Sequence, residues 1–256
     1  MIIDFAKDKL KDLVNAHGMS SELVTITCKA LSPEEAIGNP LHDDYPIQLG
    51  KERLIEAEFM GKKGQAFSDA YFNYTGSVNE ILSLRLDTNA RRAIFISSLN
   101  AILARIGKMP EAIHCKNDDL LHCGVAFGDL LARWPAARQK ALLVGLQPRL
   151  LEALASSRQV RVCDLNPDNI GTKKYGVTID GPERFAESAR WADVVFATGS
   201  TVVNGTIDEI VKARPDTVFY GVTISGVACL TGLRQFCHIT GAVPDTVCSK
   251  DYDVPR

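Results

Sequence analysis

Hydroxyl and amide side chains gather at residues 193–206, where an apolar run of the chain ends. The run at 194–197 is typical of a buried strand, and a helical pattern begins at Ile207. Small residues let a ligand approach the backbone, and the free N–H groups of a helix start favour an anion or a carbonyl. We therefore predict a ligand-binding turn formed by Thr198, Gly199, Ser200, Thr201, Asn204 and Thr206. The alternative is an ordinary strand-to-helix turn in which Thr206 caps the helix.

Three further turns of the second half carry polar side chains after apolar runs. Gln147 lies in G-L-Q-P, which is not the G-x-G-x-x-G fingerprint, and this argues against NAD as cofactor. Asp164 opens a turn that also contains Asn166 and Asn169; it can bond a ligand hydroxyl or handle protons, or it can form an Asx turn. Thr223 follows the last of these runs. The carboxyl ends of parallel strands would bring all four turns together.

The first half contains carboxylates and one amide that could face the same site. Glu56 and Glu58 alternate along an extended run and so share one face of a strand. Such a pair can handle protons or a cation, although a solvated strand face is the usual alternative. Asn100 falls within a strongly apolar helix, where a buried amide needs partners. It either ties the helix to a loop or faces a ligand.

Two His-Cys pairs, His114-Cys115 and His122-Cys123, are the cluster with metal-ligand residue types. Their spacing matches none of the standard zinc patterns, and adjacent residues on a helix point in different directions. We therefore do not expect zinc held by these four residues alone. The better interpretation is that one of these four side chains reaches a pocket. A transition metal remains a possible cofactor.

Composition and charge exclude several classes of protein. The 256 residues are 46% hydrophobic and 23% charged, with 29 Lys and Arg against 31 Asp and Glu. These values are ordinary for a chain with a buried core, and no block of like charge favours nucleic acid. No apolar run is long enough to span a bilayer, and the charged N-terminus indicates an amphipathic helix. Seven scattered cysteines are typical of reduced thiols, so we expect a cytoplasmic protein.

The elements that position these residues divide the chain near residue 110 into domains at 1–110 and 111–256. Expected elements of the first domain are helices at 2–16, 78–86 and 89–106, a strand at 23–28, and extended runs at 53–60 and 65–71 joined by residues 61–64. This is a small α+β arrangement. After a helix over 118–133, strands and helices alternate from 141 to 222, with helices expected at 148–156, 182–190 and 207–213. That alternation predicts an α/β fold with a mainly parallel sheet and helices on both faces.

Four motifs carry a family resemblance over nearly the whole chain. They are G-K-E-R-L-I-E-A-E-F with G-Q-A-F at 50–67, S-L-N-A-I-L at 98–103, A-T-G-S-T-V-V-N-G-T at 197–206 and Y-G-V-T-I-S-G at 220–226. The chain resembles the family described as "putative heavy-metal chelation", in which an enolase N-terminal-like domain precedes a Rossmann-like domain. The resemblance implies a pocket closed between the domains, in which Glu56, Glu58, Gln65 and Asn100 face Thr198, Ser200, Thr201 and Asn204. Methyltransferases are among its structural relatives, but the missing glycine-rich turn disfavours S-adenosylmethionine.

The leading functional hypothesis is an enzyme that condenses or hydrolyses a chelator-like or pterin-like compound in the interdomain pocket. Asp164, Glu58 and Glu56 are its candidates for proton handling. One alternative is a non-enzymatic protein that binds a metal or a metal chelate, and a second is a methyltransferase-like enzyme. The expected partner is a small molecule, with a homodimer left open and neither nucleic acid nor membrane involved.

Overall fold

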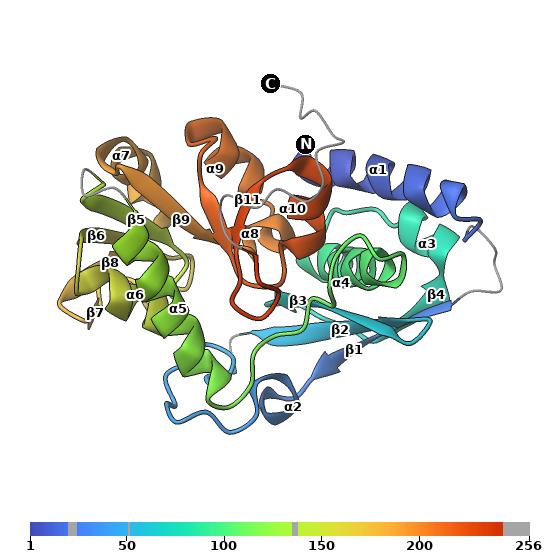
Figure 1. Ribbon diagram of the computed structural model, residues 1–256, viewed down its shortest axis with the longest axis horizontal. Helices are drawn as coiled ribbons and strands as arrows, with labels where there is room; N and C mark the ends of the chain where they lie inside the picture. Colours follow the sequence, from blue (N-terminus) through green and yellow to red (C-terminus); the bar gives the residue numbers. More distant parts are fainter. Residues whose placement is uncertain (20–24, 51, 135–137, 243–256) are drawn as a thin grey trace.

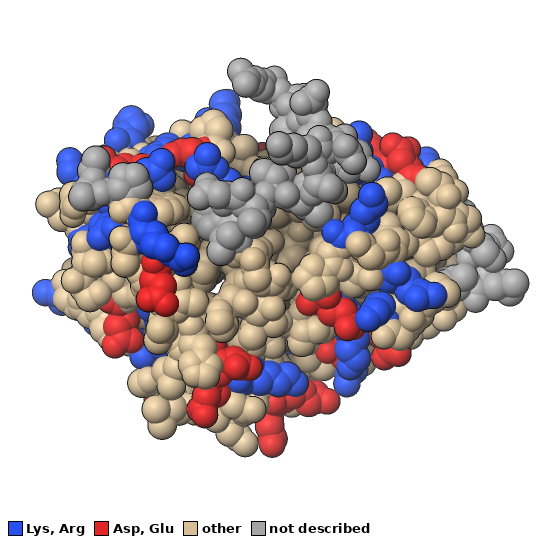
Figure 2. Space-filling view, in the orientation of Figure 1, with Lys and Arg blue, Asp and Glu red and all other residues tan. Residues whose placement is uncertain are grey.

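The computed structural model describes residues 1–19, 25–50, 52–134 and 138–242 and contains two β-sheets. A four-stranded sheet has the order β3-β2-β1-β4, and a seven-stranded sheet has the order β11-β10-β9-β5-β6-β8-β7. Figure 1 shows the small sheet below helix α4, with the large sheet and its helices beside it. Acidic and basic residues are interspersed over the face seen in Figure 2.

The small sheet is antiparallel and packs one face on a buried helix. Its strands are β1 (Thr25–Leu31), β2 (Arg53–Phe59), β3 (Lys62–Ser68) and β4 (Tyr74–Ser77). The helices of this half are α1 (Ile2–Ala16), α2 (Pro33–Ile37), α3 (Val78–Ser83) and α4 (Asn89–Arg105). Alternate residues of β1, Ile26 and Cys28, are buried in the core that contains α4, whereas Thr25, Thr27 and Lys29 are exposed. The expected strand at 23–28 is confirmed from residue 25; residues 23 and 24 lie outside the described residues.

The hairpin between β2 and β3 is tighter than the sequence suggested. Phe59 pairs with Lys62, so the turn consists of Met60 and Gly61 alone. Both have positive φ, 48° and 76°, as a type I′ turn requires. The expected connection at 61–64 is therefore wrong, because the chain reverses two residues earlier and residues 62–64 already belong to β3.

The large sheet is parallel except at one edge. Its strands are β5 (Lys140–Val144), β6 (Gln159–Cys163), β8 (Val177–Asp180), β9 (Val194–Thr198), β10 (Val218–Tyr220) and β11 (Arg234–Phe236), with the short β7 (Lys173–Lys174) antiparallel to β8. The parallel strands have the order β8-β6-β5-β9-β10-β11. This is the strand order 3-2-1-4-5-6 of a doubly wound sheet. Successive strands are added towards one edge from the first to the third, and towards the other edge from the fourth onwards. That switch point lies between β5 and β9.

Helices cover both faces of the large sheet, which confirms the expected α/β class. Helices α5 (Asp119–Arg133) and α6 (Pro148–Ala155) share a core with Leu143 and Phe196. The intervening residues Leu142 and Val195 belong to the core of the opposite face. On that face lie α7 (Phe185–Trp191), α9 (Ile207–Ala213) and α10 (Ser225–Thr231). The expected helix at 182–190 is divided into a 3-10 turn, η1 (Pro182–Arg184), and α7.

One continuous core joins the two sheets, because it contains residues of α1 and α4 as well as the inner face of β9 and β10. Helix α1 packs on α10, and the backbone N–H of Ile2 donates to Asp208 at 2.8 Å. The chain after residue 110 still pairs with the small sheet through a bridge between Gly64 and Ala112. The domain division near residue 110 stays a prediction. None of the helices in the described ranges is both long and apolar enough to cross a bilayer.

Asn100 of α4 joins the small sheet to the turn after β10. Its Nδ2 donates to the carbonyl of Gln65 at 2.9 Å and to that of Val222 at 3.3 Å, and its Oδ1 accepts from the N–H of Gly226 at 2.7 Å. Two glycines permit this approach. A Cβ on Gly64 would lie 2.3 Å from the backbone nitrogen of Ala101, and one on Gly226 would lie 2.6 Å from the Asn100 oxygen. Of the two roles predicted for Asn100, the structure shows the tie between helix and loop.

We expect Asn100→Ala to lower the free energy of unfolding by about 2–4 kcal/mol. The substitution leaves the buried N–H of Gly226 and the carbonyls of Gln65 and Val222 without their hydrogen bonds to Asn100. Urea denaturation measures the change. Asn39→Ala, at an exposed position after α2, is the control and should change stability by less than about 0.5 kcal/mol. An Asn100→Ala protein as stable as this control would show that the hydrogen bonds of Asn100 do not stabilise the contact between the two sheets.

Candidate functional site

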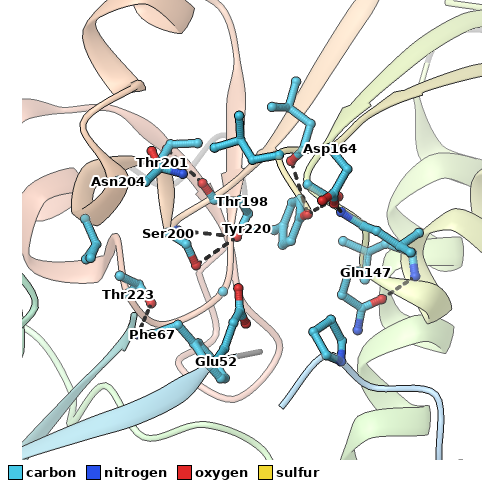
Figure 3. Close-up of a pocket in the computed structure, with 18 of the residues that line it drawn as sticks. Glu52, Phe67, Gln147, Asp164, Thr198, Ser200, Thr201, Asn204, Tyr220 and Thr223 are labelled. Atoms are coloured by element: carbon cyan, nitrogen blue, oxygen red, sulfur yellow. Dashed lines mark hydrogen bonds between the residues drawn. The ribbon is translucent and has the colours of Figure 1, made fainter. Parts of the chain in front are cut away.

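A cavity of about 470 Å³ lies at the carboxyl ends of the parallel strands, at the switch point between β5 and β9. The large sheet contributes the turns after β5, β6, β9 and β10, and the small sheet contributes the end of β3 (Figure 3). Residues 45–47 and 52 from the segment before β2, and 114–123 before and within α5, complete the wall. Doubly wound proteins bind their ligands at this place.

The predicted turn at 198–206 forms one wall of this cavity. Thr198, Ser200, Thr201, Asn204 and Thr206 all line it. The hydroxyl of Thr198 donates to Ser200 Oγ at 3.3 Å, and that of Thr201 donates to the Thr198 carbonyl at 2.8 Å. Gly199 is buried behind the lining, because a Cβ there would lie 2.8 Å from the backbone nitrogen of Ile224.

A short extra helix precedes the expected helix, whose bounds at 207–213 are confirmed. The short helix α8 (Thr201–Asn204) ends at Gly205, whose φ is 83°, before α9 begins. The hydroxyl of Thr206 donates to Asn204 Oδ1 at 2.7 Å and makes no cap bond to α9. Thr206 is therefore the N-cap residue of α9, as the alternative expected, but its side chain does not bond the helix. The bond instead fixes the Asn204 side chain at the cavity.

Asp164 also lines the cavity, but both of its oxygens hold the backbone. Oδ2 accepts from the N–H of Leu146 at 2.6 Å, and Oδ1 accepts from the N–H of Asn166 at 2.6 Å. The second bond is the Asx turn that the sequence left open, and the first ties the turn after β6 to the turn after β5. Gln147 caps α6 through Oε1, which accepts from Leu150 N at 2.7 Å, and lines the cavity together with Asn166, Asn169 and Thr223.

Glu52 is one of three acids of this cavity, with Asp69 and Glu209, that the sequence patterns did not single out. Its side chain projects into the cavity beneath Thr198 and Tyr220 (Figure 3). Burial, and then the nearby carboxylates of Asp164 and Asp69, raise the pKa of Glu52 to about 7. Glu52 directly precedes β2, so the strand alternation that selected Glu56 and Glu58 could not point to it.

Glu56, Glu58, Gln65 and Asn100 do not line the cavity among the residues described. Glu56 accepts from Lys63 at 2.8 Å and from Gln65 at 2.7 Å, and Gln65 Oε1 accepts from the His114 N–H at 2.7 Å. Glu58 is exposed. The structure therefore places Glu56 and Gln65 in a network that holds residues 111–114 against β3, and Asn100 between β3 and the turn after β10.

The metal-ligand candidates are separated by the structure. His114, Cys115 and Cys123 line the cavity, whereas His122 is exposed beside Asp119 at 3.6 Å. Burial lowers the pKa of His114 to about 4, and its ring packs edge-on against Phe67. Contact with the Cys123 thiol, and burial, raise the pKa of Cys115. Within the described ranges, no group of three or more His, Cys, Asp or Glu side chains could hold a metal ion.

Comparison with known proteins finds a family model that matches the C-terminal part of the chain. Residues 134–247 match the model of DUF364, described as "putative heavy-metal chelation". The resemblance indicated by the sequence motifs is thereby confirmed for this part of the chain. No curated protein sequence matches the chain.

Two solved structures of DUF364 members resemble the chain. A protein of unknown function from Pyrococcus horikoshii aligns over 87% of this chain and 79% of its own, with 15% identity and a TM-score of 0.51. Another of unknown function, from Desulfitobacterium hafniense DCB-2, aligns over 65% of each chain, with 10% identity and a TM-score of 0.44. At this identity, the likeness to the Pyrococcus protein shows the shared fold alone.

Replacement of Glu52 should have a pH-dependent effect on stability. The pKa of Glu52 is higher in the folded state than its ordinary value of 4.5, so folding loses stability as pH rises from about 4.5 to about 7. Glu52→Gln removes that loss. We expect it to match the wild type at pH 4 and to be more stable by about 1–3 kcal/mol at pH 8, measured by urea denaturation.

The matched control is Glu58→Gln, which alters an exposed carboxylate of β2, the strand that directly follows Glu52. It should show no comparable gain between pH 4 and pH 8. A Glu52→Gln gain that is equal at both pH values would show that Glu52 is not held in its neutral form by the fold.

Proposed function

We propose that the protein binds a small organic molecule in the switch-point cavity and acts on it by proton transfer, in a condensation or hydrolysis reaction. The observation that carries this proposal is the Glu52 carboxyl, which projects into the cavity with a pKa raised to about 7. A group with a pKa near the working pH can both donate and accept a proton, which is what general acid–base catalysis requires. The substrate class we propose is chelator-like or pterin-like, in keeping with the family description.

The remaining polar groups fit a binding role. Asp164 shapes two turns with both of its oxygens, so in this proposal Glu52 replaces it as the group that moves the proton. Ser200 and Asn204 offer a hydroxyl and an amide on the wall formed by the 198–206 turn. These groups can orient a substrate against Glu52, and the apolar wall around them limits the water that competes with it.

A non-enzymatic carrier of a metal or metal chelate is the second candidate. It is favoured by the thiols of Cys115 and Cys123 on the cavity wall and by the family description. Elemental analysis of protein purified without an affinity tag tests it. One equivalent of a transition metal that is lost in Cys123→Ser would favour the carrier, and a metal-free protein would count against it.

Methyl transfer is supported by the strand order of the large sheet alone. The turn after β5 lacks the glycine fingerprint, and Asp164 at the end of β6 already bonds two backbone N–H groups. Calorimetric titration with S-adenosylmethionine tests this candidate. No heat of binding at millimolar donor would remove it.

Native mass spectrometry of freshly purified protein tests the main proposal. We expect a retained small molecule in the wild type and its loss in Ser200→Trp, because the indole fills the cavity. Ser157→Trp, at an exposed position after α6, is the control and should keep the ligand. Equal retention by Ser200→Trp would place the ligand elsewhere. An empty wild-type protein that no fraction of a metabolite extract stabilises against heat would also contradict the proposal.

A further inference from the structure

We propose that the ligand of this cavity carries a cationic nitrogen group, an ammonium or amidinium, which pairs with the Glu52 carboxylate. This inference rests on the proposed function, since it assumes that a small molecule binds in the cavity, and it adds the chemical class of that molecule. It departs from the expectation that the 198–206 turn holds an anion.

The charge of the cavity wall is one-sided. Its described lining residues include four acids, Glu52, Asp69, Asp164 and Glu209, and no lysine or arginine. The pKa of His114 is lowered to about 4, so this histidine is neutral at pH 7 and adds no positive charge. A phosphate or carboxylate ligand would therefore meet like charge with no lysine or arginine of the described lining to offset it.

Nearby cations outside the lining already have partners. Arg149 of α6 bonds Asp44 at 2.9 Å and Glu152 at 2.9 Å, and Lys174 pairs with Asp44 at 2.5 Å. Arg149 is buried, so its guanidinium cannot turn towards the cavity without breaking its bonds to both Asp44 and Glu152. These charges hold the segment before β2 against α6 and β7, and they leave the charge of the cavity unbalanced.

Unlike the carboxylates of Asp69 and Asp164, that of Glu52 has no partner among the described residues, and unlike Glu209, Glu52 is not exposed. Asp69 accepts from Asn89 at 2.8 Å, and Asp164 holds two backbone N–H groups. Protein atoms surround Glu52 on nearly all sides, and the open cavity leaves the remainder of its side chain accessible to water. A buried carboxylate without a partner is costly, and a cationic group entering the cavity would supply the missing partner.

The rest of the wall suits a ring-bearing body. Tyr45, Phe67 and Tyr220 line the cavity, and aromatic faces attract cations as well as flat rings. A volume of about 470 Å³ is sufficient for a small organic molecule of this kind. Ser200 and Asn204 also line the cavity and can bond polar atoms of the ligand.

Pairing with a cation favours the ionised form of Glu52, so binding below about pH 7 must release a proton. The titratable groups that face Glu52 are Asp164, Asp69 and Tyr220. The pKa of Tyr220 is raised well above its usual range by burial, so its hydroxyl stays neutral. The affinity for a cation should therefore rise as pH increases from 5 to 8.

Three matched probes test the inference on the intact protein: p-aminobenzamidine, which is cationic, p-aminobenzamide, which is neutral, and p-aminobenzoate, which is anionic. Calorimetric titration at pH 8 gives the affinity of each. We expect the amidine to bind most tightly and Glu52→Gln to weaken it by at least about tenfold. The affinity for the amide should change little in Glu52→Gln, and Glu58→Gln should leave all three affinities unchanged.

The outcomes separate this inference from the proposed function. Binding of the benzoate as tightly as the amidine, or an amidine affinity unchanged in Glu52→Gln, would overturn the cationic class. If such binding were still blocked by Ser200→Trp, the cavity would remain the ligand site. Failure of all three probes to bind would also overturn the cationic class, whereas the proposed function is decided by the molecule that the wild-type protein retains.

Discussion

The Asn100 amide is the contact on which the arrangement of the two sheets depends. It is fully buried, and its hydrogen bonds reach the Gln65 carbonyl in β3 and the Gly226 N–H at the start of α10. Leaving a buried amide without partners costs more free energy than its hydrogen bonds contribute when they form. These bonds therefore fix the position of α4 against β3 and α10. Gly64 and Gly226 have no side chains that would keep the backbones apart. The end of β3 is thereby fixed beside the turn after β10.

The cavity follows from this geometry. A second link, from the Phe67 N–H to Thr223 Oγ1 at 3.0 Å, holds the end of β3 against the same turn. The segment before β2 is held on the other side by the ion pairs of Asp44 with Arg149 and Lys174. Glu52 ends that segment, so the same contacts carry its carboxyl over the switch point of the large sheet. An acid is thus placed where burial and like charge raise its pKa.

Much of the fold could be predicted from local patterns. The alternating elements after residue 140 predicted the parallel sheet, and four polar turns predicted that its carboxyl edge carries the site, because strand ends of a parallel sheet share one edge. The two-residue hairpin was missed because Met60, a non-glycine residue, adopts positive φ there. Helix α8 was missed because four residues are too few to show a helical period.

The chemistry within the site was harder to predict than its location. Glu56 and Glu58 could be selected from the sequence because strand alternation is a local signal. The raised pKa of Glu52 arises from burial and from the carboxylates of Asp164 and Asp69, which depend on the tertiary fold. Asn100 could be identified as an amide in need of partners, but two of those partners lie 35 and 126 residues away. Short-range periodicity contains no information on pairings of that separation.

The central claim is that the joined sheets enclose a carboxyl that is half-protonated near neutral pH. Carbon-13 NMR titration of the Glu52 side-chain carboxyl, assigned by its absence in Glu52→Gln, measures this directly in the intact ligand-free protein. We predict a midpoint near pH 7. A midpoint at the ordinary glutamate value of about 4.3 would contradict the account, because Glu52 would then lie in open solvent.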